Sequence, residues 1–234
     1  MNDISAAWST ALRLIAAFDP QLVEIVALSM KVSVTAVVLS ALIGLPCGAA
    51  LAVVRFPGRK MIAVVLNALM GLPPVVVGLV VYLLLSRAGP LGQYGLLFTP
   101  SAMVIAQTFL CAPIMAALSR QVIEDAWREY EEQLRSLGAG PLRAASTLLW
   151  DVRFSLVTIV LAGFGRAAAE VGAVMIVGGN IDGVTRVMTT TIALETSKGD
   201  LPLALGLGII LLGIVLGVNA AAQLVKDAAA RRYG

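Results

Sequence analysis

The sequence contains no histidine, and only 13% of its 234 residues are charged, while 59% are apolar. Histidine is the side chain that most often transfers protons or binds metals near neutral pH, so its absence removes many enzyme mechanisms. Soluble domains carry about a quarter charged residues, because a water-exposed surface needs polar cover. The composition therefore argues against a soluble enzyme or a disordered chain and favours an integral membrane protein. The net charge of +3 is too small to indicate nucleic-acid binding.

Cysteine and nucleotide-binding motifs are also scarce. Cys47 and Cys111 each lie in an apolar run. They are interpreted as small buried hydrophobic residues rather than a disulfide or a metal site. The phosphate-binding pattern G-x-x-x-x-G-K-[ST] does not occur, so the chain has no P-loop for ATP. The sequence thus predicts no catalytic residue, no cofactor and no metal on this chain.

What the sequence does contain is a series of long charge-free runs. About 20 apolar residues in a helix cross the hydrocarbon core, and helices satisfy their backbone hydrogen bonds internally. The runs predict an all-α integral membrane protein, a single domain over 1–234 with five spans. The predicted spans are 22–54, 61–86, 98–119, 154–178 and 201–225.

Apolar residues also recur at helical spacing before the first span. They are Ile4, Trp8, Leu12, Ile15 and Phe18, and Asp19-Pro20 follows as a stop. The segment is too short to cross a bilayer, so it predicts an amphipathic helix on the outer surface. A sixth span that begins near residue 5 is the alternative.

Lysine and arginine are unevenly distributed between the two sets of span ends. The smaller set comprises Arg13, Lys31, Arg87, Arg186 and Lys198. The larger set comprises Arg55, Arg59, Lys60, Arg120, Arg128, Arg135, Arg143, Arg153, Lys226, Arg231 and Arg232. Because cytoplasmic loops carry the excess of basic residues, we expect the N-terminus outside and the C-terminus inside.

Prolines interrupt several of these runs. Pro46 and Pro113 favour ordinary kinks, which neighbouring helices repair in membranes. The segment Gly71-Leu-Pro-Pro74 fits equally a kink or a broken helix that lines a pathway.

The stretch 120–153 is the most highly charged part of the chain. Glu129 to Leu137 favours a helix, Gly138 suits the left-handed position after it, and Pro141 suits the first turn of a second helix. Two helices around a glycine turn form either a docking knob on the cytoplasmic face or a solvated linker.

Residues in this stretch resemble a known family. Glu132-Gln-Leu-Arg-Ser-Leu-Gly138-Ala139 resembles the EAA loop of ABC importer permeases, although Gln133 and Leu134 replace the usual two alanines. The usual Leu-Pro pair is missing as well, because Leu148-Leu-Trp-Asp151 stands in its place. Further segments look like the permease subunit of tungstate importers, with molybdate permeases as relatives. They are Ser29–Ser33, Gly71–Leu79, Gly89–Gly92, Trp150–Phe154, Gly163–Gly172, Gly178–Ile181 and Thr185–Arg186.

The resemblance implies the transmembrane domain of a type I ABC importer in a prokaryotic plasma membrane. Its partners would be a second copy of the chain, cytoplasmic ABC ATPases that bind ATP and Mg, an extracytoplasmic oxyanion-binding protein and membrane lipid. The implied substrate is tungstate, with molybdate or sulfate as alternatives. The implied ATPase-coupling residues are Glu132, Leu134, Leu137, Gly138 and Ala139.

Pathway or gate residues are predicted in and after the fourth span. Arg166 and Glu170 stand four residues apart, so on one helix they would pair at the same face, either as a gate or as a neutralised structural pair. The following loop offers Asn180, Thr185 and Arg186 as oxyanion donors or as a docking site, and otherwise is a glycine-rich turn before a threonine-capped helix.

Two other functions compete with the importer. An ion-coupled carrier would use the Arg166–Glu170 pair, but the inverted repeats expected of such carriers are not visible in the sequence. An intramembrane enzyme would need more than Glu170, because no His-Glu-x-x-His, Gly-x-Ser-x-Gly or paired intramembrane aspartates occur.

Overall fold

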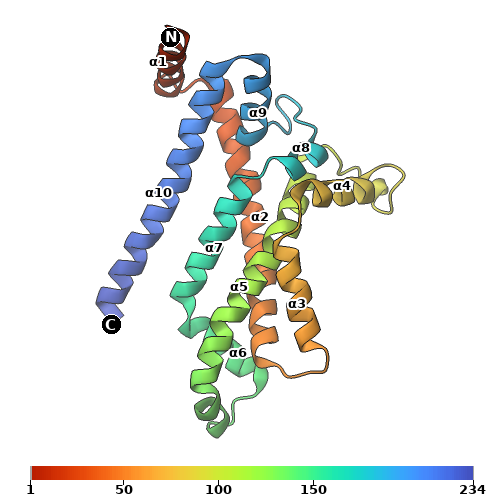
Figure 1. Cartoon of the computed structure of the whole chain (residues 1–234), viewed down its shortest axis with the longest axis vertical. Helices are drawn as coiled ribbons and strands as arrows, with labels where there is room; N and C mark the ends of the chain where they lie inside the picture. Colours follow the sequence, from red (N-terminus) through yellow and green to blue (C-terminus); the bar gives the residue numbers. More distant parts are fainter. Residues whose placement is uncertain (1, 234) are drawn as a thin grey trace. The chain divides into compact units, whose positions relative to one another are not determined.

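The structure of the chain is a computed structural model that describes the backbone of residues 2–233 and the side chains of residues 7–224. Ile4 and the basic residues Lys226, Arg231 and Arg232 therefore lie outside the described side chains. The described backbone is all-helical (Figure 1). Its helices are α1 (Asn2–Ala16), α2 (Pro20–Val53), α3 (Arg59–Met70), α4 (Pro74–Leu85), the 3-10 helix η1 (Gly92–Tyr94), α5 (Pro100–Ser136), α6 (Pro141–Asp151), α7 (Arg153–Ala168), α8 (Gly172–Gly178), α9 (Met188–Lys198) and α10 (Leu201–Tyr233).

The helices group into two compact units, which we describe separately. Unit 1 contains residues 1–35, 74–107 and 168–221, and unit 2 contains residues 36–73, 108–167 and 222–234. The interpretation of the chain as one domain stays a prediction.

Three helices are long and apolar enough to cross a membrane, namely α2, α5 and α10. Two broken pairs, α3 with α4 and α6 with α7, raise the number to five if each pair counts as one span. Pro46 and Pro113 lie inside α2 and α5, which continue past them. The all-helical membrane fold is thus confirmed.

The helix boundaries differ from the predicted spans at three places. The span 61–86 contains two helices of 12 residues each, because Leu72-Pro73-Pro74 cannot continue the hydrogen-bond ladder. The span 154–178 contains α7 and α8, with residues 169–171 between them. In contrast, α5 runs on to Ser136, because no glycine or proline interrupts it between Pro113 and Leu137.

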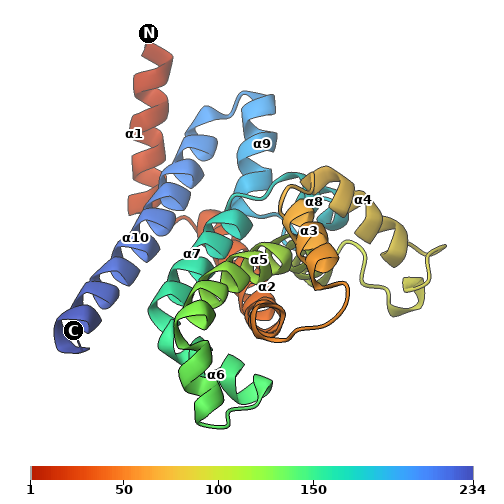
Figure 2. The same ribbon diagram turned by 60° about the horizontal axis from the view of Figure 1, so that its bottom comes forward.

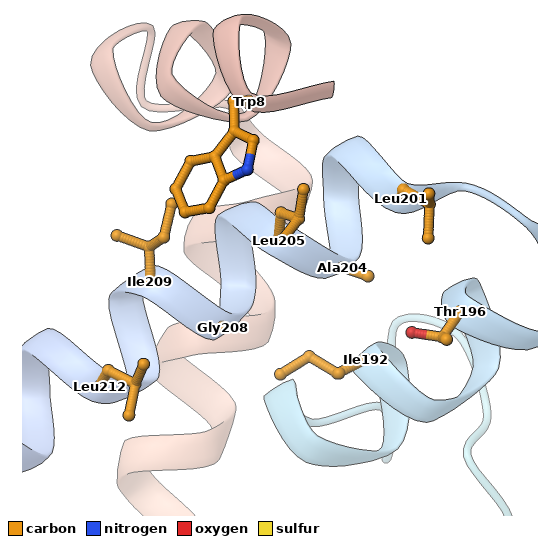
Figure 3. Close-up of a pocket in the computed structure, with 9 residues that line it drawn as sticks. All are labelled: Trp8, Ile192, Thr196, Leu201, Ala204, Leu205, Gly208, Ile209 and Leu212. Carbon is orange, nitrogen blue, oxygen red and sulfur yellow. The ribbon is translucent and has the colours of Figure 1, made fainter. Parts of the chain in front are cut away.

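The N-terminal helix ends and α2 begins as Asp19-Pro20 predicts. Phe18 adopts a left-handed conformation with φ of 50°, and the Asp19 carboxylate accepts hydrogen bonds from the backbone N–H groups of Gln21 and Leu22 at 3.0 and 3.2 Å. In unit 1, α1 lies beside the first half of α10 (Figure 2), and Trp8 covers an apolar pocket of about 310 Å³ beside Leu205 and Ile209 (Figure 3). Ala7 and Ala11 are the buried residues of α1, whereas Trp8 and Leu12 of the predicted apolar face are exposed, so the placement of α1 on the outer membrane surface stays a prediction.

Each unit has its own core. In unit 1, Leu22, Ile25, Met188 and Leu207 form a buried cluster. In unit 2, residues of α2, α5 and α6 form another, described below. Cys111 is buried, as predicted, but the prediction of a buried Cys47 is wrong, because Cys47 is exposed. An apolar run in a membrane protein faces lipid as readily as a core, so the sequence pattern alone does not separate the two.

Candidate functional site

The turn between α5 and α6 has a well-defined hydrogen-bond pattern. Gly138 is left-handed, with φ of 70°. Its N–H donates to the carbonyl of Arg135 at 2.9 Å, and the N–H of Ala139 donates to the carbonyl of Leu134 at 2.9 Å. These two bonds define a Schellman motif, and Pro141 then begins α6. The conformations predicted for Gly138 and Pro141 are therefore confirmed.

The turn is fixed to unit 2 by an apolar core beneath it. Leu134 packs against a buried cluster that joins the end of α2, the second half of α5 and α6, so its side chain points inward. The buried members are Ala49, Ala52, Val53, Ile123, Ala126, Trp127, Ala144, Ala145 and Leu148. Leu134 thus helps to position the turn, and its predicted contact with an ATPase stays a prediction.

Ion pairs add a second attachment. Glu131 accepts from Arg55 at 2.8 Å and from Arg135 at 2.6 Å, so one carboxylate joins the α2–α3 loop to the last turn of α5. The neighbouring Glu132 is exposed and forms no ion pair within the described part of the chain. Consecutive glutamates therefore have different roles, because one faces the loop and the other faces outward.

The outer surface of the turn is unusually apolar for a charged segment. Leu137 is 82% exposed and Leu142 is 80% exposed, on either side of Gly138. Trp150, at the end of α6, is 72% exposed and lies under the guanidinium of Arg153, 5.0 Å from the ring centroid. Large apolar side chains that are this exposed on an ordered turn favour a protein contact surface.

Glu170 lies between α7 and α8 and is only 3% exposed. The prediction that Arg166 and Glu170 stand one turn apart on a single helix is wrong, because α7 ends at Ala168. One Glu170 carboxylate oxygen accepts from the N–H of Ala173 at 3.0 Å, and its carbonyl accepts from the Thr189 hydroxyl at 2.8 Å. Glu170 thus holds the first turns of α8 and α9 against the non-helical segment between α7 and α8. Arg166 belongs to unit 2, where it is half-buried in α7.

Helices α8 and α4 pack closely in unit 1. A Cβ added to Gly78 of α4 would lie 2.8 Å from the Cα of Ala173, so glycine is required for this approach. After α8, Gly179 and Asn180 are both left-handed, with φ of 71° and 50°. The backbone N–H of Phe98 donates to the carbonyl of Val177 at 3.0 Å, which attaches the segment before α5 to the end of α8.

Thr185 closes the loop that follows α8. Its buried hydroxyl donates to the carbonyl of Gly178 at 2.6 Å and accepts from the N–H of Ile181 at 2.9 Å. A hydroxyl has one hydrogen to donate, and this one is already used. The expectation that Thr185 offers a free donor to an oxyanion is therefore wrong.

The other threonines of the loop are used in the same way. The hydroxyl of Thr189 donates to Glu170, and those of Thr190 and Thr191 donate to the carbonyl of Val187 at 3.0 and 2.8 Å. Thr190 also accepts from the N–H of Val187 at 3.1 Å, which caps α9 as the threonine-capped alternative predicts.

Asn180 and Arg186 retain unused polar atoms. The side-chain oxygen of Asn180 and the Nε of Arg186 are buried without a hydrogen-bond partner. The Arg186 guanidinium also pairs with Asp182 at 2.8 Å, and its side chain is mostly buried. The unused Arg186 Nε is a donor that can meet an oxyanion or a docking protein, whereas the unused Asn180 oxygen is an acceptor and can meet only a donor group.

Ser29 of α2 also takes part in the hydrogen bonds that position α9. The Ser29 hydroxyl donates to the carbonyl of Ile25 at 2.6 Å and accepts from the N–H of Met188 at 2.7 Å. Ser29 therefore holds the first residue of α9. In the sequence, Ser29 was considered only as part of a family motif. A polar side chain within an apolar run was the signal that could have indicated its structural hydrogen bonds.

Residues 44–234 match the family described as the binding-protein-dependent transport system inner membrane component. The chain belongs to this family. It is 42% identical to the tungstate uptake system permease protein of Peptoclostridium acidaminophilum, over 97% of this chain and 100% of that protein. A probable anion ABC transporter permease protein of Haloferax volcanii is also 42% identical, over 91% and 94% of the two chains. The molybdenum transport system permease protein of Mycobacterium tuberculosis is 30% identical over 86% and 80%.

The chain is therefore a multi-pass inner-membrane permease of a binding-protein-dependent ABC transporter, and it is not itself an enzyme. Its family implies an ATPase and a binding protein as partners.

Proposed function

We propose that this permease forms the translocation path of a tungstate importer. The family motifs in the sequence support this substrate, and so does the full-length relative that is named as a tungstate uptake permease. The more distant molybdenum permease has 30% identity. Tungstate and molybdate share size, charge and tetrahedral geometry, so the binding protein is expected to select between them.

We also propose that the ATPase docks on the α5–α6 turn. The carrying observation is that Leu137 and Leu142 are almost fully exposed on a turn that a Schellman motif, an apolar core and ion pairs hold rigid. Glu132, Leu137, Gly138 and Ala139 contribute to this surface, together with Leu142 and Trp150. Leu134 supports the surface from below.

The continuity of α5 gives the turn its mechanical role. A helix of 37 residues runs without a break from Pro100 to Ser136, so a displaced turn moves the whole helix. Rigid elements of this kind transmit a change at an interface to a distant site. ATP and Mg bind to the partner ATPase in this proposal, and the permease converts closure of that partner into movement of α5.

The permease is proposed to act as a homodimer, with its N-terminus outside and its C-terminus in the cytoplasm. The distribution of basic residues supports the orientation. The loop after α8 then faces the binding protein. Thr185 and Glu170 hold that loop in shape, while Asn180 and Arg186 serve docking or gating.

Cellular metal content tests the substrate. Cells with and without the gene are grown in limiting tungstate, molybdate and sulfate together, and tungsten, molybdenum and sulfur are measured by mass spectrometry. Loss of tungsten alone is expected. Loss of molybdenum or sulfur instead would identify molybdate or sulfate as the substrate. No change in any of the three elements would contradict the importer and favour the ion-coupled carrier.

A variant of Leu137, compared with a matched control on α5, tests the docking surface. Leu137→Asp is expected to abolish association with the cognate ATPase while the thermal stability of the permease stays unchanged, because Leu137 is exposed. Gln121→Asp, at an exposed position of α5 outside the turn, is the matched control. Normal ATPase association of Leu137→Asp would contradict the docking assignment.

A further inference from the structure

A second polar site lies in unit 2, between the α2–α3 loop and the middle of α5. A cavity of about 470 Å³ opens where the α2–α3 loop meets α5. Basic side chains dominate its wall, and a single carboxylate, that of Glu124, lies among them. The lining residues are Arg55, Phe56, Gly58, Arg59, Lys60, Ala63, Arg120 and Glu124.

The carboxylates near this cavity do not balance its positive charge. Glu124 pairs with Arg59 at 3.0 Å and with Arg120 at 2.6 Å, so one negative charge is shared by two arginines. Arg55 pairs with Glu131, which is itself shared with Arg135. The described ion pairs leave the arginines in excess.

Two further groups carry unused capacity. Lys60 is exposed and forms no ion pair within the described residues. The Arg120 side chain is only 14% exposed, and its buried Nε donates to no acceptor. A buried donor without an acceptor is costly, and a bound anion would satisfy it.

The position of the cavity identifies the kind of anion. The charge-free run of α2 ends at Val54 and that of α3 begins at Met61, so the cavity lies where two apolar segments meet the membrane surface. The first residues of α3 line the cavity, and α3 buries none of its residues, with Met61, Ile62, Val64 and Val65 exposed. An anion with an attached hydrocarbon chain would satisfy both the basic cavity and this apolar helix.

We propose that this cavity binds the phosphate of an anionic phospholipid, whose acyl chains lie along α3. Arg120, Arg59 and Lys60 hold the phosphate, and basic pockets at the membrane surface bind acidic headgroups in this way. The three residues that hold the phosphate are not among those assigned to the ATPase-docking surface or to the loop after α8, so the proposal does not depend on either assignment. A bound lipid would stabilise the α2–α3 loop, whose Arg55 also anchors Glu131 of α5.

Native mass spectrometry of the purified, delipidated permease tests the proposal. Dioleoyl phosphatidylglycerol is titrated against zwitterionic dioleoyl phosphatidylcholine, and tight, saturable binding of one phosphatidylglycerol per chain is expected. Lys60→Gln breaks no ion pair and is expected to weaken this binding about fivefold, the effect of one cation near a phosphate. Arg120→Lys, which keeps the charge but removes the Nε donor, is expected to weaken it as well.

The matched control is Arg128→Gln, which removes one positive charge from an exposed position of α5 outside the cavity. Equal lipid binding by the control, Lys60→Gln and Arg120→Lys would overturn the proposal. Displacement of the lipid by millimolar inorganic phosphate or tungstate would assign the cavity to a soluble anion instead. Unchanged lipid binding with lost ATPase association in Lys60→Gln would assign it to the protein partner.

Discussion

The α5–α6 turn and the loop after α8 are built from similar residues but present different surfaces. Both contain left-handed glycines, Gly138 in the first and Gly179 in the second. The first keeps Leu137 and Glu132 free at its surface, whereas in the second the threonine hydroxyls donate to backbone carbonyls. A surface that binds a partner needs side chains free of internal contacts, and a loop that must keep its shape uses them internally.

The largest effect is expected in the loop of unit 1. Thr185→Val removes a buried hydroxyl and leaves the Gly178 carbonyl and the Ile181 N–H without partners. We expect a loss of about 3 kcal/mol in the free energy of unfolding. Denaturation of the purified permease measures this change, and Thr185→Ser should restore most of the stability because it keeps the hydroxyl. Equal stability of Thr185→Val and the unmodified chain would show that the loop is not closed by this residue.

A pair of leucines sharpens the comparison within the turn itself. Leu134→Ala is expected to lower the free energy of unfolding by about 2 kcal/mol, because its side chain packs on the core of unit 2. Leu137→Ala should change stability by less than about 0.5 kcal/mol, because it is exposed. Thermal unfolding compares the two, and a larger loss for Leu137 than for Leu134 would reverse the assigned orientations.

Two glycines separate backbone strain from side-chain bulk. Gly138→Ala should destabilise the turn by about 1–2 kcal/mol, because an L-residue resists the left-handed conformation. No atom lies within 4 Å of the added Cβ, so a clash contributes nothing. Gly140 has φ of −68° and the same open space, so Gly140→Ala should be nearly neutral. Uptake and the free energy of unfolding are measured for both variants. Equal values for Gly138→Ala and Gly140→Ala would contradict this explanation.

Only a small change in stability is expected at Arg186. Its ion pair with Asp182 is partly solvent-screened, so Arg186→Ala should cost less than about 1 kcal/mol. We nevertheless expect a strong loss of uptake, because Arg186 retains an unused buried donor on the side proposed to meet the binding protein. Full uptake and normal docking of the binding protein would remove Arg186 from the pathway and leave the loop with a structural role only.

Several features could be predicted because they depend on local interactions. Gly138 and Pro141 favour one backbone conformation each, so the turn between α5 and α6 follows from neighbouring residues alone. Asp19-Pro20 likewise marks the start of α2. The prolines of Gly71-Leu-Pro-Pro74 also mark the break between α3 and α4, while the pathway role of this broken helix stays a prediction.

The errors occurred where distant residues decide. Thr185 was a plausible donor until its hydroxyl met the Gly178 carbonyl, seven residues away. Leu134 and Leu137 belong to the same motif, yet only the core formed with α2 and α6 determines that Leu134 is inside. Cys47 and Cys111 sit in equally apolar runs, and only packing separates the exposed one from the buried one.

The sequence by itself determined that this is a helical membrane protein, because long charge-free runs have few other stable forms in lipid. It also determined the position of the α5–α6 turn, because Gly138 and Pro141 each favour one backbone conformation. Only the tertiary structure decided which polar groups remain available. A hydroxyl or guanidinium has a small number of hydrogen bonds to give, and residues far away in the chain decide which of them are already used.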